Sequence, residues 1–141
     1  MARINLNQDR FFEPDSKTRA IARELYEEVR EMPIISPHGH VDPKILSENT
    51  NFPNPAELLI IPDHYIFRMF YSQGIRLEDL GIPTVDGSDI EQDPRKIWKI
   101  FCDNYFLFSG TPTKMWLSFV FKEVFDIKEH PNEHNALSLY D

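Results

Sequence analysis

Residues 93–125, DPRKIWKIFCDNYFLFSGTPTKMWLSFVFKEVF, carry the strongest folding signal in the chain. Twice in this segment a proline directly follows a residue that caps helices well, at Asp93-Pro94 and Thr111-Pro112. The side-chain oxygen of such a cap accepts one of the unpaired backbone N–H groups at a helix start, and proline in the next position loses no hydrogen bond. Tryptophan and phenylalanine follow each start at helical spacing. The segment therefore predicts two helices with broad apolar faces, each buried on two sides.

Similar signals predict helices along the rest of the chain. The cap-and-proline pair recurs at Asp42-Pro43 and Asn54-Pro55. Apolar residues four apart predict an earlier helix over about 16–31, which Pro33 ends. The remaining helical stretches expected from spacing are 43–48, 55–60, 63–72, one turn at 76–81 and a helix start at 135–141.

One short apolar run stands apart from this helical pattern. Ile34-Ile35-Ser36 follows Pro33 and reads as a short buried strand. The predicted fold class is therefore mainly α with one short strand, in a single unit that spans residues 1–141.

Composition limits the classes of function. The 141 residues are 41% apolar and 13% aromatic, which predicts one domain with a true core and excludes intrinsic disorder. A formal net charge of −8 disfavours nucleic acid as a partner. The single cysteine excludes an internal disulfide, no apolar run approaches the roughly 18 residues of a membrane span, and residues 1–10 lack the apolar core of a signal peptide. We expect a cytoplasmic protein that binds neither nucleic acid nor membrane.

Two histidines follow the predicted strand directly, at His38 and His40. On an extended backbone, residues two apart point the same way, so the two imidazoles would converge. Two neutral imidazoles form half of a site for a divalent metal such as zinc, and Gly39 between them leaves space for the ion. The plainer interpretation is a pair of exposed loop histidines.

A second cluster lies in Asp63-His64-Tyr65-Ile66-Phe67-Arg68. His64 and Arg68 are four apart and so share one face of the predicted helix, with Tyr65 beside them. A guanidinium binds carboxylates, and an imidazole or phenol moves protons. The plainer interpretation is a helix surface that lies over the core.

The other chemically notable residues have structural interpretations. Cys102, Trp98 and Trp116 lie among aromatic or helically spaced apolar residues and are expected in the core. His130 and His134 are expected to be loop histidines, because Pro131 prevents a helical pairing.

The order of these motifs resembles the N-terminal part of the uronate isomerase (glucuronate isomerase) family, which belongs to the amidohydrolase superfamily. The motifs that carry the resemblance are the helix over 16–31, Ile34-Ile35-Ser36-Pro37-His38-Gly39-His40, Asp63-His64-Tyr65-x-x-Arg68, the aromatic stretch 98–108, Gly110-Thr111-Pro112 with Trp116, and 135–141.

The resemblance implies the N-terminal part of a (β/α)8 TIM barrel. Residues about 33–42 would form its first strand and end in His38 and His40 as ligands of a divalent metal, expected to be zinc. Residues about 43–141 would form a helical insertion after that strand. The implied reaction is the aldose–ketose isomerisation of hexuronates, D-glucuronate to D-fructuronate and D-galacturonate to D-tagaturonate.

The resemblance also implies roles for the second cluster. Tyr65 is the candidate for proton transfer and His64 lies at the substrate, so both are candidate catalytic residues, and His64 also binds. Arg68 either contacts the substrate or forms an ion pair. The expected partner is a small-molecule hexuronate, together with further copies of the chain in a homo-oligomer.

Length conflicts with a complete barrel. A TIM barrel needs about 250 residues, whereas this chain offers one predicted strand of eight. We therefore expect an N-terminal fragment that is inactive alone, with exposed apolar faces that favour self-association.

Two other functions fit parts of the sequence. A metal-dependent amidohydrolase of the same superfamily would share the His-x-His pair, although it has no evident use for Arg68. A non-catalytic helical interaction module would leave His38 and His40 incidental.

Overall fold

The computed structural model describes residues 3–39 and 42–141, and these are predominantly helical. The chain divides into two compact units, one of Met1–Ile4 and His40–Asp141 and the other of Asn5–Gly39. Each unit is described by itself.

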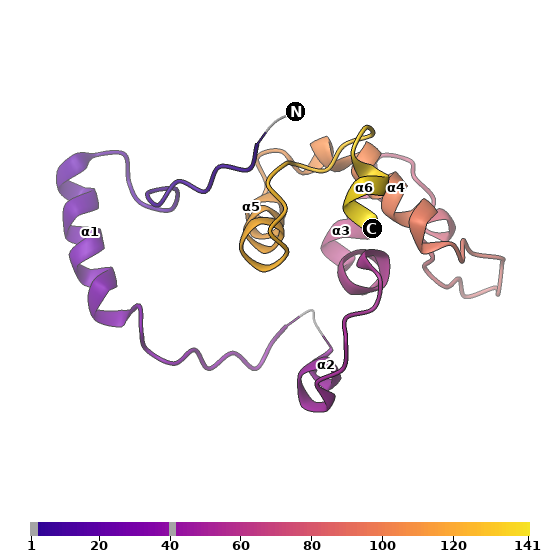
Figure 1. The fold of residues 1–141 in the computed structure, drawn as a ribbon, viewed down its shortest axis with the longest axis horizontal. Coiled ribbons are helices and arrows are strands. Elements are labelled where there is room, and N and C mark those ends of the chain that lie inside the picture. The colour runs from indigo at the N-terminus through magenta and orange to yellow at the C-terminus, as the bar shows by residue number, and fades with distance from the viewer. Residues whose placement is uncertain (1–2, 40–41) are drawn as a thin grey trace. The chain divides into compact units, whose positions relative to one another are not determined.

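The larger unit is a cluster of short helices and helical turns (Figure 1). Its elements are α2 (Pro43–Glu48), the π-helical turn η1 (Ala56–Ile60), α3 (His64–Ser72), the 3-10 turn η2 (Glu78–Leu80), α4 (Pro94–Asp103), the 3-10 turn η3 (Tyr105–Phe108), α5 (Pro112–Phe119), the π-helical turn η4 (Val120–Val124) and α6 (Ala136–Tyr140).

The core of this unit is built around α4. Phe101 is fully buried, stacks with Trp98 at 5.1 Å between ring centroids, and contacts Phe121 of η4 edge-on. Phe70 of α3 meets both Phe101 and Phe108 edge-on, at 6.1 and 5.3 Å. Edge-to-face and offset pairs are the favourable arrangements of aromatic rings, so this cluster holds α3, α4, η3 and η4 together.

Hydrogen bonds attach the two ends of the larger unit to this core. The buried indole N–H of Trp98 donates to the carbonyl of Ala136 at 2.7 Å and fixes α6 beside α4. The N–H of Ile4 donates to the carbonyl of Lys128 at 2.8 Å, next to an isolated antiparallel bridge between Arg3 and Glu129. The first described residues of the chain are thus joined to the segment before α6.

The smaller unit consists of α1 (Ser16–Val29) and the segments on either side of it. Arg23 donates to Asp9 and lies over the ring of Phe12, which in turn meets Tyr26 edge-on. No residue of α1 is buried, and its apolar positions Ile21, Leu25 and Val29 are all about half exposed or more. This unit is therefore held by surface contacts and has no core of its own.

The predicted helix starts are confirmed. Asp42 and Asp93 each accept the backbone N–H two residues on at 2.9 Å. Thr111 accepts the N–H of Lys114 at 3.2 Å, and Asn54 accepts that of Glu57 at 3.0 Å. Each of the four caps satisfies an N–H group that the helix itself leaves unpaired.

The predicted strand at Ile34-Ile35-Ser36 is wrong for this structure. These residues have no regular secondary structure, and the side chains of Ile34 and Ile35 are 91% and 93% exposed. A strand is held by hydrogen bonds to a neighbouring strand, and no segment within residues 3–39 and 42–141 pairs with these three.

The prediction that both aromatic helices are buried on two sides is wrong. α4 places Ile97, Trp98, Phe101 and Cys102 in the core and leaves its lysines exposed. α5 buries only Leu117 and Ser118, while Trp116, expected in the core, is 43% exposed. The reason is that the core of this unit contacts one face of each helix, so the remaining apolar side chains face outward.

Cys102 behaves as the sequence predicts. Its thiol is buried in the core, and burial raises its pKa to about 12. A thiol with such a pKa is scarcely ionised near neutral pH and is a poor nucleophile. None of the helices that the structure describes is long and apolar enough to span a lipid bilayer.

The central position of Phe101 yields a stability prediction. Phe101→Ala should lower the free energy of unfolding by about 3–5 kcal/mol, because it opens a cavity where five aromatic rings meet. Phe106→Ala is the matched control: Phe106 lies in the next helical turn and is 65% exposed, so its loss should stay within about 0.5 kcal/mol. Denaturant unfolding followed by tryptophan fluorescence measures both, and equal losses would contradict the arrangement of the core.

Candidate functional site

Helix α3 brings three of the predicted site residues to one surface. The helix starts after Asp63, whose carboxylate accepts the N–H of Tyr65 at 2.9 Å, and it ends before Gly74, which has a φ of +84°. A positive φ is natural for glycine and ends a helix. Ile66 and Phe70 on the inner face are fully buried against the aromatic core. This anchoring fixes which side of α3 faces outward.

The outer face of α3 carries His64, Tyr65 and Arg68. The rings of His64 and Tyr65 lie 4.4 Å apart between centroids and are tilted by 33°. Tyr65 is 59% exposed, His64 is half-buried and Arg68 is exposed. Residues three and four apart on a helix are surface neighbours, so Arg68 lies beside both rings. The predicted helix over these residues is confirmed, and their role as a site stays a prediction.

This surface has the chemistry of an anion site with a proton-transfer group. None of the ion pairs among the described residues involves Arg68, which leaves its guanidinium available for a negatively charged ligand. A guanidinium binds a carboxylate through two parallel hydrogen bonds. A phenol and an imidazole next to it are the groups that enzymes use to move protons.

The structure describes only one of the two predicted metal ligands. His38 lies in the smaller unit, exposed, and its carbonyl accepts a hydrogen bond from the Ser36 hydroxyl at 3.0 Å. His40 lies outside the described residues. The convergence of the two imidazoles therefore stays a prediction.

The described residues do not make a metal site by themselves. Within residues 3–39 and 42–141, no three His, Cys, Asp or Glu side chains are grouped so that they could hold an ion. A zinc site in an enzyme uses at least three protein ligands. The donors that the structure describes are therefore not grouped into a complete zinc site.

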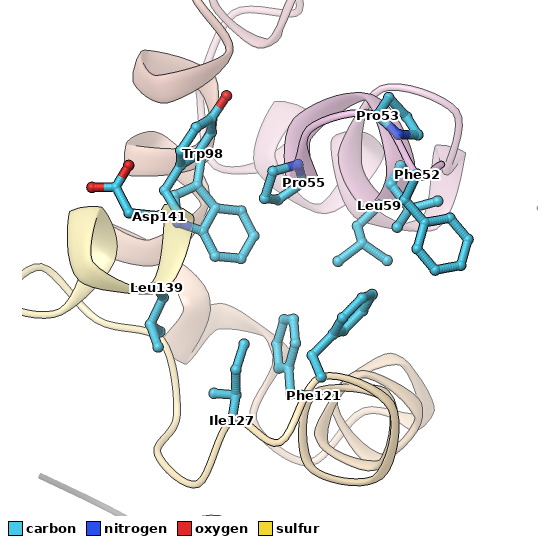
Figure 2. Close-up of a pocket in the computed structure, with 12 residues that line it drawn as sticks. Phe52, Pro53, Pro55, Leu59, Trp98, Phe121, Ile127, Leu139 and Asp141 are labelled. Atoms are coloured by element: carbon cyan, nitrogen blue, oxygen red, sulfur yellow. The ribbon is translucent and has the colours of Figure 1, made fainter. Parts of the chain in front are cut away.

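A pocket in the larger unit is a poor site for a charged substrate (Figure 2). It has a volume of about 270 Å³ and lies between η1, α4, η4 and α6. Figure 2 shows Trp98, Phe121 and Leu59 among its apolar walls. Its one charged lining group is Asp141, which pairs with Arg95, and this partner lowers the pKa of the Asp141 carboxyl. An apolar pocket whose one charged lining group is a paired carboxylate offers no cation to bind an acidic sugar.

Sequence reasoning missed a titratable pair inside the larger unit. His130 stacks on Tyr105 at 5.8 Å between ring centroids, and Lys114 of α5 lies over the same tyrosine ring. The Tyr105 hydroxyl and His130 Nδ1 are buried and make no well-formed hydrogen bond with the described residues. Burial raises the pKa of Tyr105, although the nearby Ser118 offsets part of the effect. No spacing in the sequence signals this contact, because 25 residues separate the two rings.

Comparison with known proteins gives the family. The profile of the glucuronate isomerase family matches residues 6–141, which is nearly the whole chain. The chain belongs to the glucuronate isomerase family.

Relatives in this family are similar over almost all of the chain. A uronate isomerase from Rhizobium meliloti (strain 1021) is 52% identical over 136 residues, which are 96% of this chain and 29% of the relative. A uronate isomerase from Xanthomonas euvesicatoria pv. vesicatoria (strain 85-10) is 49% identical over 138 residues, or 98% of this chain and 29% of the relative. The chain thus spans about 29% of the length of these glucuronate isomerase family members.

Solved structures of the family have a similar fold over most of this chain. A glucuronate isomerase from Caulobacter crescentus matches with a TM-score of 0.84 and 43% identity, over 95% of this chain and 28% of that structure. A uronate isomerase from Thermotoga maritima matches with a TM-score of 0.67 and 27% identity, over 86% of this chain and 25% of that structure.

The burial of His130 predicts a loss of stability in acid. Burial, and to a lesser degree Lys114, lowers the pKa of His130 in the folded chain below its unfolded value of about 6.5. The unfolded chain therefore binds a proton more readily. The contribution of His130 to the free energy of unfolding is complete above about pH 6.5 and decreases as the pH falls through the folded pKa.

His130→Gln removes this dependence. The stability of the unsubstituted chain should fall more steeply than that of the variant between about pH 7.5 and 5, as measured by denaturant unfolding at a series of pH values. His134→Gln is the control, since His134 is exposed and should follow the unsubstituted chain. Parallel curves for the chain and His130→Gln would contradict the prediction.

Proposed function

We propose that this chain takes part in the aldose–ketose isomerisation of hexuronates, D-glucuronate to D-fructuronate and D-galacturonate to D-tagaturonate. The single observation that carries the proposal is the outer face of α3, where His64, Tyr65 and Arg68 lie together in a chain of the glucuronate isomerase family. The names of the relatives support the same reaction.

The reaction moves a proton between C2 and C1 of the sugar through an enediol. Tyr65 is the candidate for this transfer, because its phenol is exposed at the start of α3 and can reach a bound ligand. His64 lies against the Tyr65 ring at 4.4 Å and contacts the substrate from the same side. Its imidazole can donate to or accept from a sugar hydroxyl.

Arg68 binds the C6 carboxylate in this proposal. It is exposed one turn after Tyr65, and a charge-assisted pair with a carboxylate both orients and holds the sugar. The same residue favours an isomerase of uronates over the hydrolase of a neutral amide, since a neutral amide offers no carboxylate to bind.

The proposal includes the architecture of the full-length enzyme. Residues about 43–141 would be a helical insertion after the first strand of a (β/α)8 barrel, and residues about 33–42 that strand. The predominance of helices among the described residues of the larger unit supports the first assignment. The exposure of Ile34 and Ile35 supports the second, because two adjacent isoleucines outside any core are available to a neighbouring strand. A homo-oligomer in the cytoplasm stays a prediction.

The proposal also includes a divalent metal, zinc foremost, bound by His38 and His40 with ligands from the rest of a full-length family member. Zinc would supply a Lewis acid for the sugar oxygens.

A chimera tests the proposed reaction. The chain replaces the aligned 136 residues of the Rhizobium meliloti uronate isomerase, and conversion of D-glucuronate is measured. We expect turnover in the ordinary enzymatic range of about 1–10³ s⁻¹, and none from the relative without the graft. A folded but inactive chimera would contradict the proposal. If the chimera does not fold, a second graft of residues 63–72 alone into the same relative takes its place.

Matched substitutions in the chimera separate the roles on α3. Tyr65→Phe should lower kcat by about 10²–10⁴-fold, as expected for loss of a proton-transfer group, while Tyr71→Phe, on another side of the same helix, should not. Arg68→Ala should raise KM for uronates by about 10- to 100-fold, because a hydrogen bond to a charged group contributes about 1.5–3 kcal/mol. Arg76→Ala is its control, since Arg76 pairs with Glu78 outside α3. An unchanged KM for Arg68→Ala would remove Arg68 from the site.

Metal content tests the proposed ligands independently of activity. The chimera should retain about one equivalent of zinc after dialysis, measured by elemental mass spectrometry. His38→Ala should weaken zinc binding by about 100-fold or more. Removing only a residue that hydrogen-bonds to a metal ligand already lowers metal affinity by about 10–100-fold, and this variant removes the ligand itself. His134→Ala, at an exposed histidine, should retain the metal. Equal retention in both variants would exclude His38 as a ligand.

A further inference from the structure

Asp63 differs from the other aspartates that start helices. Among the described residues, four helices begin after an aspartate whose carboxylate accepts a backbone N–H of the first turn: α1, α2, α3 and α4. Asp15 and Asp42 are exposed and Asp93 is half-buried, whereas Asp63 is only 8% exposed. A buried side chain has little freedom to move, so this cap holds its helix more rigidly than the others do.

The group that Asp63 holds is the backbone of the candidate proton-transfer residue. Its Oδ1 accepts the N–H of Tyr65 at 2.9 Å. Its carbonyl accepts from the N–H groups of Ile66 and Phe67, at 3.0 and 3.2 Å. Three successive residues of the first turn are thus hydrogen-bonded to Asp63.

The rest of α3 is positioned by a different contact. Ile66 and Phe70 are fully buried and set the rotation of the helix about its axis. Ile66 already lies in the first turn, so His64 and Tyr65 stand just before this core contact, at the N-terminal end of a helix of nine residues. Helix ends fray when their N–H groups lose their partners. Because α3 has only nine residues and begins at His64, fraying of its first turn would displace His64 and Tyr65.

We propose that Asp63 is a positioning residue for the proton transfer by Tyr65. Its buried carboxylate fixes the first turn of α3 and so keeps the phenol of Tyr65 at the reacting carbon, whereas the backbone at Arg68 lies between Ile66 and Phe70, which are buried in the core. This inference rests on the isomerisation proposed above and adds a residue to that site.

The test compares two helix caps in the chimera. Asp63→Ala should lower kcat by about 100-fold, because a misplacement of about 1 Å costs that much, and should change KM for D-glucuronate by less than about threefold. Asp93→Ala removes an equivalent cap, since Asp93 accepts the N–H of Arg95 at the same 2.9 Å. It should lower the melting temperature and leave kcat within about threefold.

A graded series separates positioning from charge. Asparagine and serine cap helices about as well as aspartate, glycine less well and alanine poorly. The kcat of Asp63→Asn and Asp63→Ser should therefore stay near that of the unsubstituted chimera, Asp63→Gly should be intermediate, and Asp63→Ala lowest. Should Asp63→Ala not fold, the Gly variant provides the same comparison with Asp93→Gly.

Three outcomes would overturn the inference. One is an equal loss of kcat in Asp63→Ala and Asp93→Ala, which would reduce Asp63 to a stability role. Another is an Asn variant as slow as the Ala variant, which would make the charge itself the requirement. The third is an unchanged kcat in Asp63→Ala. Failure of the proposed function is distinct from all three, because the chimera with unsubstituted Asp63 would then be inactive.

Discussion

The contact on which the larger unit depends is the packing of aromatic rings around Phe101. Trp98 stacks on it from the same helix, Phe70 reaches it from α3 and Phe121 from η4, and it is completely removed from solvent. The unit has no sheet among its described residues, so these ring contacts, together with the hydrogen bond from Trp98 to the carbonyl of Ala136, take the place of a strand ladder. Apolar burial of this size is the main favourable contribution to folding, and here it also decides how each helix is oriented.

The orientation of α3 connects this core to the chemistry. Phe70 and Ile66 face inward, and the same helical repeat that buries them turns Tyr65 and Arg68 outward. A group held on a helix that is anchored in a core is more precisely placed than one on a loop. The candidate site is in this sense a consequence of the aromatic core, and the buried cap at Asp63 extends the anchoring to the first turn of the helix.

The segment around His38, unlike α3, is not anchored in the aromatic core. It follows two almost fully exposed isoleucines in a unit where no residue of α1 is buried. Within the described residues no strand pairs with Ile34-Ile35-Ser36, and no group of three metal-binding side chains is found. The relatives are more than three times longer than the stretch they share with this chain. The proposed half-site of two imidazoles would need further ligands, and the proposed strand would need a neighbour.

The amino-acid sequence alone determined where the helices begin and which of their faces carry reactive side chains. The starts at Asp42, Asn54, Asp93 and Thr111 follow from hydrogen bonds that span no more than three residues, and the grouping of His64, Tyr65 and Arg68 follows from the helical repeat. Only the tertiary structure decided that Trp116 faces solvent, that His130 stacks on Tyr105, that Asp63 is buried and that Ile34-Ile35-Ser36 forms no strand. The physical reason is the separation along the sequence of the residues that interact. Caps and helix faces are set by neighbours within one or two turns, whereas burial and strand pairing require partners that are distant along the chain.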